Sequence, residues 1–172
     1  MANTYVLIAS NVLGSSASSV TLSSIPQTYK DLHLVMSTRE TNAAIQAYPE
    51  VRPNGVTGYS NSRLYTGNTD ASTGGQSQIN RDGIQFLSNG ANSTSNTFAL
   101  TEMYFPSYTG STKKVISSHN VQENNSTTAN QTGQYIIAGL TNATTAISSI
   151  QIVSFNQFVA GSSFHLYGIK NS

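Results

Sequence analysis

The stretch of sequence that decides the fold is Phe158-Val159-Ala160-Gly161-Ser162-Ser163-Phe164-His165-Leu166-Tyr167-Gly168-Ile169-Lys170. Gly161 supplies the backbone freedom that a turn requires, and polar serines follow it. After this turn the side chains alternate, so Phe164 and Leu166 share one face of a predicted β-strand. The opposite face takes His165, Tyr167 and Ile169. Because an exposed edge strand this apolar would aggregate, we expect it to close the domain from inside a sheet, with Phe164 and Leu166 in the core.

Working outward from this strand, the same two-residue period recurs along the chain. Leu32, Leu34 and Met36 define one face, opposite His33 and Val35. Further segments of β character end at a Pro53-Asn54-Gly55 turn or span residues 5–9, 20–23, 59–65, 84–87, 98–105, 113–121, 135–140 and 146–155. No segment keeps a 3.6-residue apolar period. The pattern predicts an all-β fold, an antiparallel β-sandwich of jelly-roll type with roughly eight to ten strands.

The second half of the chain shows the alternation most clearly. Phe98, Leu100 and Tyr104 share one face of the expected strand 98–105, and the opposite face takes Ala99, Met103 and Phe105. In the next strand Val115 and Val121 lie opposite Ile116. A chain of 172 residues fits a single domain over residues 1–172.

Residues 39–95 read differently, because they are rich in Asn, Gly, Ser and Thr. Residues 43–47 could form one helical turn, which would be too short to be stable alone. Polar loops are predicted over residues 67–78, 88–95 and 123–132.

The composition describes a polar surface that is nearly uncharged. Charged residues make up 9% of the chain, against about 25% in an average protein. Ser, Thr and Asn together supply more than a third of the residues, and the net charge is +1. Such a surface lacks the charge repulsion that keeps monomers apart. It suits a protein that stays packed against neighbours, and it equally suits an extracellular adhesin.

Several classes of protein are disfavoured by the same composition. The absence of cysteine rules out disulfides and thiolate metal sites. The N-terminus carries no basic region followed by an apolar run, so we expect no signal peptide and synthesis in the cytosol. The apolar runs are too short for a membrane helix. Basic residues do not cluster beyond Lys113-Lys114, so we expect no nucleic acid and no membrane as partners.

Motifs that carry catalytic chemistry are weak or absent. His33, His119 and His165 lie in separate predicted strands without metal-ligand spacing, so we expect no metal. Glu102 falls mid-strand, where an inward carboxylate would be perturbed, although such a residue more often pairs with Arg or Lys or marks a subunit contact. No carboxylate pair of the glycosidase type, Gly-x-Ser-x-Gly motif or phosphate loop is recognisable. We therefore expect no catalytic residue, no cofactor and no enzyme.

Both ends of the chain resemble one protein family. Residues 4–9, Leu13-Gly14-Ser15-Ser16 and residues 20–32 are similar to its opening, and residues 158–170 are similar to its end. Between them Asn54-Gly55, Tyr108-Thr109-Gly110-Ser111 and Glu123-Asn124-Asn125 fit its pattern, whereas Pro53 departs from it. The family is that of small virion structural proteins of tailed bacteriophages.

The resemblance implies a non-enzymatic structural protein of a phage particle, which we expect on the capsid surface of the virion. Its roles there are capsid decoration, in which a homotrimer would bridge and cement major capsid subunits, and less often head or tail fibres. The alternative is therefore a fibre or adhesin module that binds host glycans. That alternative predicts an exposed aromatic cluster, with Tyr48, Tyr59 and Tyr65 as candidates.

Overall fold

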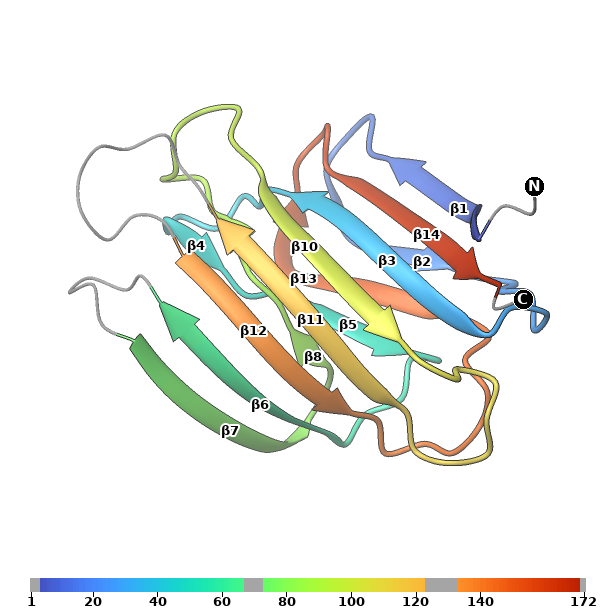
Figure 1. The fold of residues 1–172 in the computed structure, drawn as a ribbon. Helices are drawn as coiled ribbons and strands as arrows, with labels where there is room; N and C mark the ends of the chain where they lie inside the picture. Colours follow the sequence, from blue (N-terminus) through green and yellow to red (C-terminus); the bar gives the residue numbers. More distant parts are fainter. Residues whose placement is uncertain (1–3, 67–72, 123–132, 171–172) are drawn as a thin grey trace.

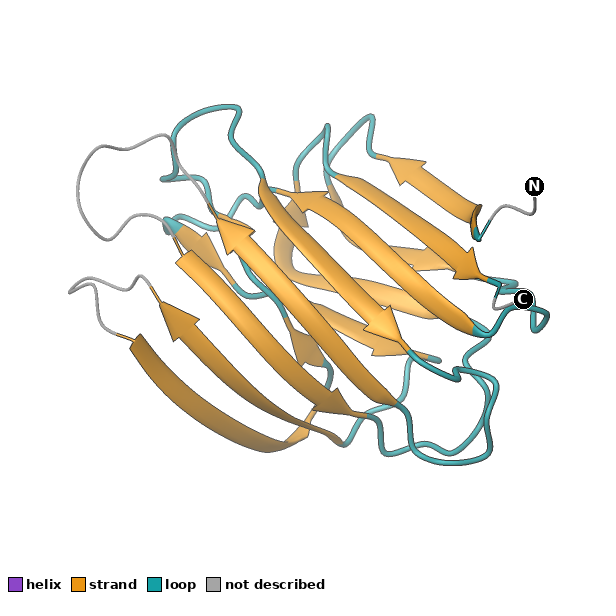
Figure 2. Cartoon of the chain, in the orientation of Figure 1, coloured by secondary structure: helices purple, strands orange, loops and turns teal. Residues whose placement is uncertain are grey.

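The structure is a computed structural model that describes residues 4–66, 73–122 and 133–170. These residues form strands and connecting loops without a helix (Figures 1 and 2). The fourteen strands are β1 (Tyr5–Val12), β2 (Ala17–Leu22), β3 (Asp31–Thr38), β4 (Gln46–Ala47), β5 (Glu50–Pro53), β6 (Tyr59–Thr66), β7 (Thr73–Arg81), β8 (Ile84–Gln85), β9 (Ser88–Asn89), β10 (Ala99–Phe105), β11 (Val115–Gln122), β12 (Gly133–Leu140), β13 (Ile150–Phe158) and β14 (Ser163–Ile169).

The strands form two stacked antiparallel sheets and a short pair (Figure 1). The larger sheet has eight strands in the order β1-β14-β3-β10-β11-β12-β6-β7. The smaller has the order β2-β13-β5-β8, and β4 pairs with β9. The predicted all-β antiparallel sandwich is therefore confirmed, whereas a jelly roll is not, because the strands divide as eight and four.

Strand β14 occupies the predicted place inside a sheet. It pairs with β1 on one side and β3 on the other, with Leu166 opposite Leu34 and Phe164 opposite Met36. Phe164 and Leu166 are fully buried, and the Phe164 ring meets the Phe158 ring edge-on at 5.2 Å between centroids. Gly161 has φ +87°, so the preceding turn uses the conformation that only glycine adopts freely.

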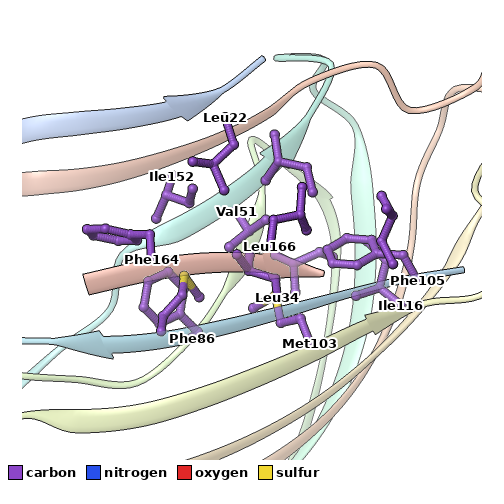
Figure 3. Packing of buried hydrophobic residues seen from close by; sticks show 14 of the residues in the cluster. Leu22, Leu34, Val51, Phe86, Met103, Phe105, Ile116, Ile152, Phe164 and Leu166 are labelled. Atoms are coloured by element: carbon purple, nitrogen blue, oxygen red, sulfur yellow. The ribbon is translucent and has the colours of Figure 1, made fainter. Parts of the chain in front are cut away.

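The core fills the space between the two sheets (Figure 3). The alternation predicted for β10 is confirmed, since Met103 and Phe105 are buried while Leu100 and Tyr104 face solvent. Tyr29 also packs inward, close against Gly168. A Cβ atom at Gly168 would overlap the Tyr29 ring, so this close approach requires glycine.

The polar middle of the chain is more ordered than its composition predicts. The loop expected over 67–78 is wrong from Thr73 on, because residues 73–81 form strand β7 along β6. This edge strand is held by backbone pairing and buries few side chains, so it lacks the apolar alternation that would reveal it. The rest of that predicted loop, and the loop at 123–132, lie outside the described residues.

Some shorter segments also differ between the sequence-based prediction and the structure. The helical turn at 43–47 is wrong, because Gln46 and Ala47 form β4, and part of the expected loop 88–95 is its partner β9. The strand expected at 146–155 runs over 150–158 instead. The strand ending at Pro53 is confirmed, and Pro53 lies opposite Ile150. Two- and four-residue strands raise the count above the eight to ten predicted, because so few residues carry no readable period.

Replacing the buried ring of β14 should destabilise the whole sandwich. We expect Phe164→Ala to lower the free energy of unfolding by about 3–5 kcal/mol, because it removes a fully buried ring and leaves a cavity. The matched control is Phe155→Ala on β13, where the ring is 60% exposed and its loss should cost within about 0.5 kcal/mol. Urea denaturation followed by circular dichroism measures both. Equal losses for the two variants would show that β14 is peripheral.

Candidate interaction surface

The outer face of the eight-stranded sheet, the side turned away from the four-stranded sheet, gathers exposed apolar side chains. Ten of the eleven large hydrophobic residues that are exposed among the described residues lie on it, and only Phe155 lies elsewhere. They are Tyr5, Leu7, Val12, Leu64, Ile79, Leu100, Tyr104, Val115, Val121 and Ile136. We call this side the outer face.

An outer face of this kind differs from the usual solvated side of an antiparallel sheet, which carries polar residues. Between the apolar residues it presents small hydroxyl side chains, such as Ser37 and Ser117. No Lys or Arg of the described strands points to this side. Large apolar patches on proteins mark sites of interaction.

The outward side of the four-stranded sheet is polar by comparison. Thr21 and Arg52 flank Gln151 across β2, β13 and β5. The Arg52 guanidinium lies 2.8 Å from the Glu50 carboxylate, and Arg81 lies 3.5 Å from the other oxygen of that carboxylate. This buried carboxylate is thus neutralised by two cations. The contrast leaves the outer face as the candidate surface for a partner.

Glu102 and His119 lie side by side at the middle of the outer face. The register places Glu102 on β10 directly opposite His119 on β11, with Val35 on the other flank of Glu102. The Nε2 atoms of His119 and Gln134 lie 2.9 Å apart. Glu102 does share a face with Leu100 and Tyr104, as predicted, but that face is the outer one. The alternative of an inward carboxylate is therefore wrong.

The three histidines all reach the outer face but remain separate. His165 Nδ1 lies 3.0 Å from Ser10 Oγ, and the His33 ring meets the Tyr5 ring edge-on. His119 is on β11, with β3 and β10 between it and His165. Across residues 4–66, 73–122 and 133–170, no three His, Asp or Glu side chains come close enough to hold a metal ion.

A buried carboxylate fixes one border of the outer face. Asp31 accepts hydrogen bonds from the Tyr104 hydroxyl at 2.6 Å and from the Ser107 amide at 2.7 Å. The bond to Asp31 stabilises the protonated phenol and raises the pKa of Tyr104 to about 12. Tyr104 is therefore a fixed, neutral ring at this surface.

The aromatic cluster predicted for glycan binding is only partly assembled. Tyr48 and Tyr65 both pack on Tyr135, with ring centroids 6.1 and 5.7 Å apart, and the Arg63 guanidinium lies 5.4 Å from the Tyr135 ring. Tyr59 is fully buried and donates its hydroxyl to the Pro53 carbonyl, so its assignment to an exposed cluster is wrong. A buried hydroxyl that finds a backbone acceptor leaves no trace in the sequence.

Glu40 is a second feature that the sequence did not reveal. Its side chain is 1% exposed and accepts one hydrogen bond, from Ser154 Oγ at 2.8 Å. Burial raises the pKa of Glu40 to about 7, because the ionised form loses its hydration, while the Ser154 bond opposes the shift. Its partner comes from β13, far along the chain, so sequence spacing could not indicate it.

Comparisons with protein-family models, curated proteins and solved structures found no match. Within the described residues there is no helix long and apolar enough to cross a membrane.

The raised pKa of Glu40 predicts a pH dependence of stability. The folded protein keeps the Glu40 proton up to about pH 7, while the unfolded chain releases it near 4.5. Stability should therefore fall as pH rises through this window, by up to about 3 kcal/mol. Glu40→Gln, which is neutral at every pH, should lose this slope. Urea titrations at several pH values compare the two proteins, and identical pH profiles would contradict the assignment.

Proposed function

We propose that this protein is a structural component of a tailed-phage virion, most specifically a decoration protein that binds the outer capsid shell. In this role it bridges and stabilises major capsid subunits and carries out no catalysis. The observation that supports an assembly role is the apolar outer face, which is free of Lys and Arg within the described strands. The assignment to a phage capsid comes from the resemblance at both ends of the chain.

The physical properties of the chain fit attachment to a shell. A sandwich built from long-range antiparallel pairings is a rigid body, since strands from both ends of the sequence share one sheet. Cement function requires only that such a body bury surface against its neighbours, and a standard interface buries about 1,600 Å² in total. Repeated over a shell, contacts of this size resist the internal pressure of packaged DNA. The resemblance also implies that copies assemble, as homotrimers.

The second candidate is a head or tail fibre module that binds host glycans. The partly exposed Tyr48 and Tyr65 rings beside Arg63 favour it, because aromatic faces next to hydrogen-bond donors suit sugar rings. The two rings, however, pack on the Tyr135 ring, which occupies part of their surface. A glycan array probed with the wild-type protein and Tyr48→Ala would detect such binding.

The location of the protein in a particle tests the proposed function directly. We expect a cryo-electron microscopy map of the phage that encodes this chain to hold the sandwich on the outside of the capsid, against the major capsid protein. Particles made without the gene should release DNA at lower temperature, because the bridging contacts are lost. Density on a fibre would support the alternative. Absence from purified particles would contradict both.

A further inference from the structure

The outer face divides into two unlike halves along the line between β10 and β11. On the β1-β14-β3-β10 half, one row across the strands carries bulky side chains, in the order Leu7, Tyr167, His33 and Tyr104. The same row continues over β11-β12-β6-β7 with small side chains, in the order Ser117, Ala138, Ser62 and Ser77. Along this row the surface of the first half is therefore raised, and the surface of the second half is low; we call the second half the low half.

The low half is hollowed. Three open hollows of about 420 to 540 Å³ lie over β12, β6 and β7. Gly75, Leu64 and Ile136 line two of these hollows, and Ala138 lines one of those two and the third. The hollows thus lie on the half of the face that lacks bulky rings in the matching row.

The row through the centre adds two polar side chains to this pattern. Glu102 lies on one side of the dividing line and His119 on the other. The next positions outward are both apolar, Val35 beside Glu102 and Ile136 beside His119. In the bulky row one half is large where the other is small, and in the central row a carboxylate lies opposite an imidazole with apolar positions on both flanks.

We propose that two copies of this chain pack face to face through their outer faces, about a two-fold axis that runs parallel to the strands above the line between β10 and β11. This rotation lays β10 of each copy over β11 of the other and β3 over β12. Glu102 then faces the partner's His119, and Tyr104 faces the partner's Ser117. Val35 meets the partner's Ile136, so large side chains face small ones, the carboxylate faces the imidazole, and apolar residues face apolar residues.

The alternative two-fold axis, perpendicular to the strands, fails on the same grounds. It would lay each strand over its own copy, so the hollowed strands would face hollowed strands. Where it passes over the row of Leu7, Tyr167, His33 and Tyr104, these bulky side chains would meet themselves. Where it passes over the central row, it would also place Glu102 against the partner's Glu102, and like charges that face each other are unfavourable. The arrangement of residues therefore selects the axis parallel to the strands.

The size of the face suits this occupant. Eight strands spaced about 4.8 Å apart, with about 3.3 Å per residue, give a face of roughly 900 Å² for strands of seven residues. A stable interface buries about 800 Å² on each partner. A contact between identical faces is isologous and closes at two copies. If trimers also form through other surfaces, the closed assembly has six copies.

This inference rests on the assembly role proposed above, though not on its assignment to a virion. Two single substitutions test it in the purified full chain, Glu102→Lys and His119→Glu. Each replaces both central contacts of the two-fold pair with like or unfavourable charges, so each alone should raise the dissociation constant at least tenfold. In an equimolar mixture, the new lysine of one copy faces the new glutamate of the other, and its wild-type His119 faces Glu102, so mixing should restore the pair.

Mixing the two single variants distinguishes the contact between copies from effects of each substitution within one chain. Glu102 and His119 are also neighbours in the same sheet, but mixing cannot repair a change inside a single chain. Thr21→Lys, on the outward side of β2, is the matched control and should leave assembly unchanged. Circular dichroism verifies that each variant is folded.

Sedimentation velocity over micromolar concentrations gives the readout. We expect the wild-type protein to sediment as an oligomer of twice the monomer mass of 18.3 kDa, or six times that mass. Each single variant should sediment as a smaller species. A wild-type monomer at every concentration, a three-copy assembly indifferent to both substitutions, or a mixture that stays dissociated would each overturn the proposal. Capsid binding is measured separately on phage particles. Loss of the two-copy contact would therefore leave the proposed function untouched, and absence from the capsid would leave the two-copy contact untouched.

Discussion

The constraint on which the rest of the structure depends is that one sheet is apolar on both sides. The inner side of the eight-stranded sheet is covered by the four-stranded sheet, and residues such as Phe164 and Leu166 lie fully buried there. The outer side carries nearly as many large apolar residues, yet the described chain supplies no third layer to cover it. The fold is complete as a sandwich, and the proposed packing of two copies would cover the apolar surface that it leaves exposed.

The low charge of the chain means that little charge repulsion protects this apolar outer side from association. A protein that exposes an apolar sheet normally surrounds it with Lys and Glu to prevent association. Here the described strands place no Lys or Arg on that face and hold Glu102 beside His119 at its centre. Of the four other carboxylates in the described residues, all but Asp82 are buried: Asp31 accepts from Tyr104, Glu50 is held by Arg52 and Arg81, and Glu40 lies beside Ser154. The surface is therefore suited to association rather than to repulsion.

The sequence revealed strands wherever side chains alternate between two environments. Strand β3 could be predicted because burial on one face forces a two-residue apolar period, seen at Leu32, Leu34 and Met36. The edge strand β7 has no such period, because backbone pairing and polar contacts such as Ser62–Ser77 hold it, with little apolar burial. The alternation in β10 indicates two faces, but not which one a second sheet covers, so the exposure of Leu100 became visible only in three dimensions. Buried Glu40 depends on a donor from the distant strand β13, and Tyr59 depends on the backbone carbonyl of Pro53, and no pattern of side chains encodes either bond.

The most direct test of the central claim, that the outer face is covered by a second copy, is a distance measured between copies. The chain has no cysteine, so Ser117→Cys gives one attachment point for a spin label near the middle of the outer face. Packed sheets lie about 10 Å apart, so double electron–electron resonance should detect label pairs separated by less than about 25 Å. Labels at Thr21→Cys, on the opposite side of the sandwich, should be much farther apart. A short distance at Thr21 with none at Ser117 would contradict the account.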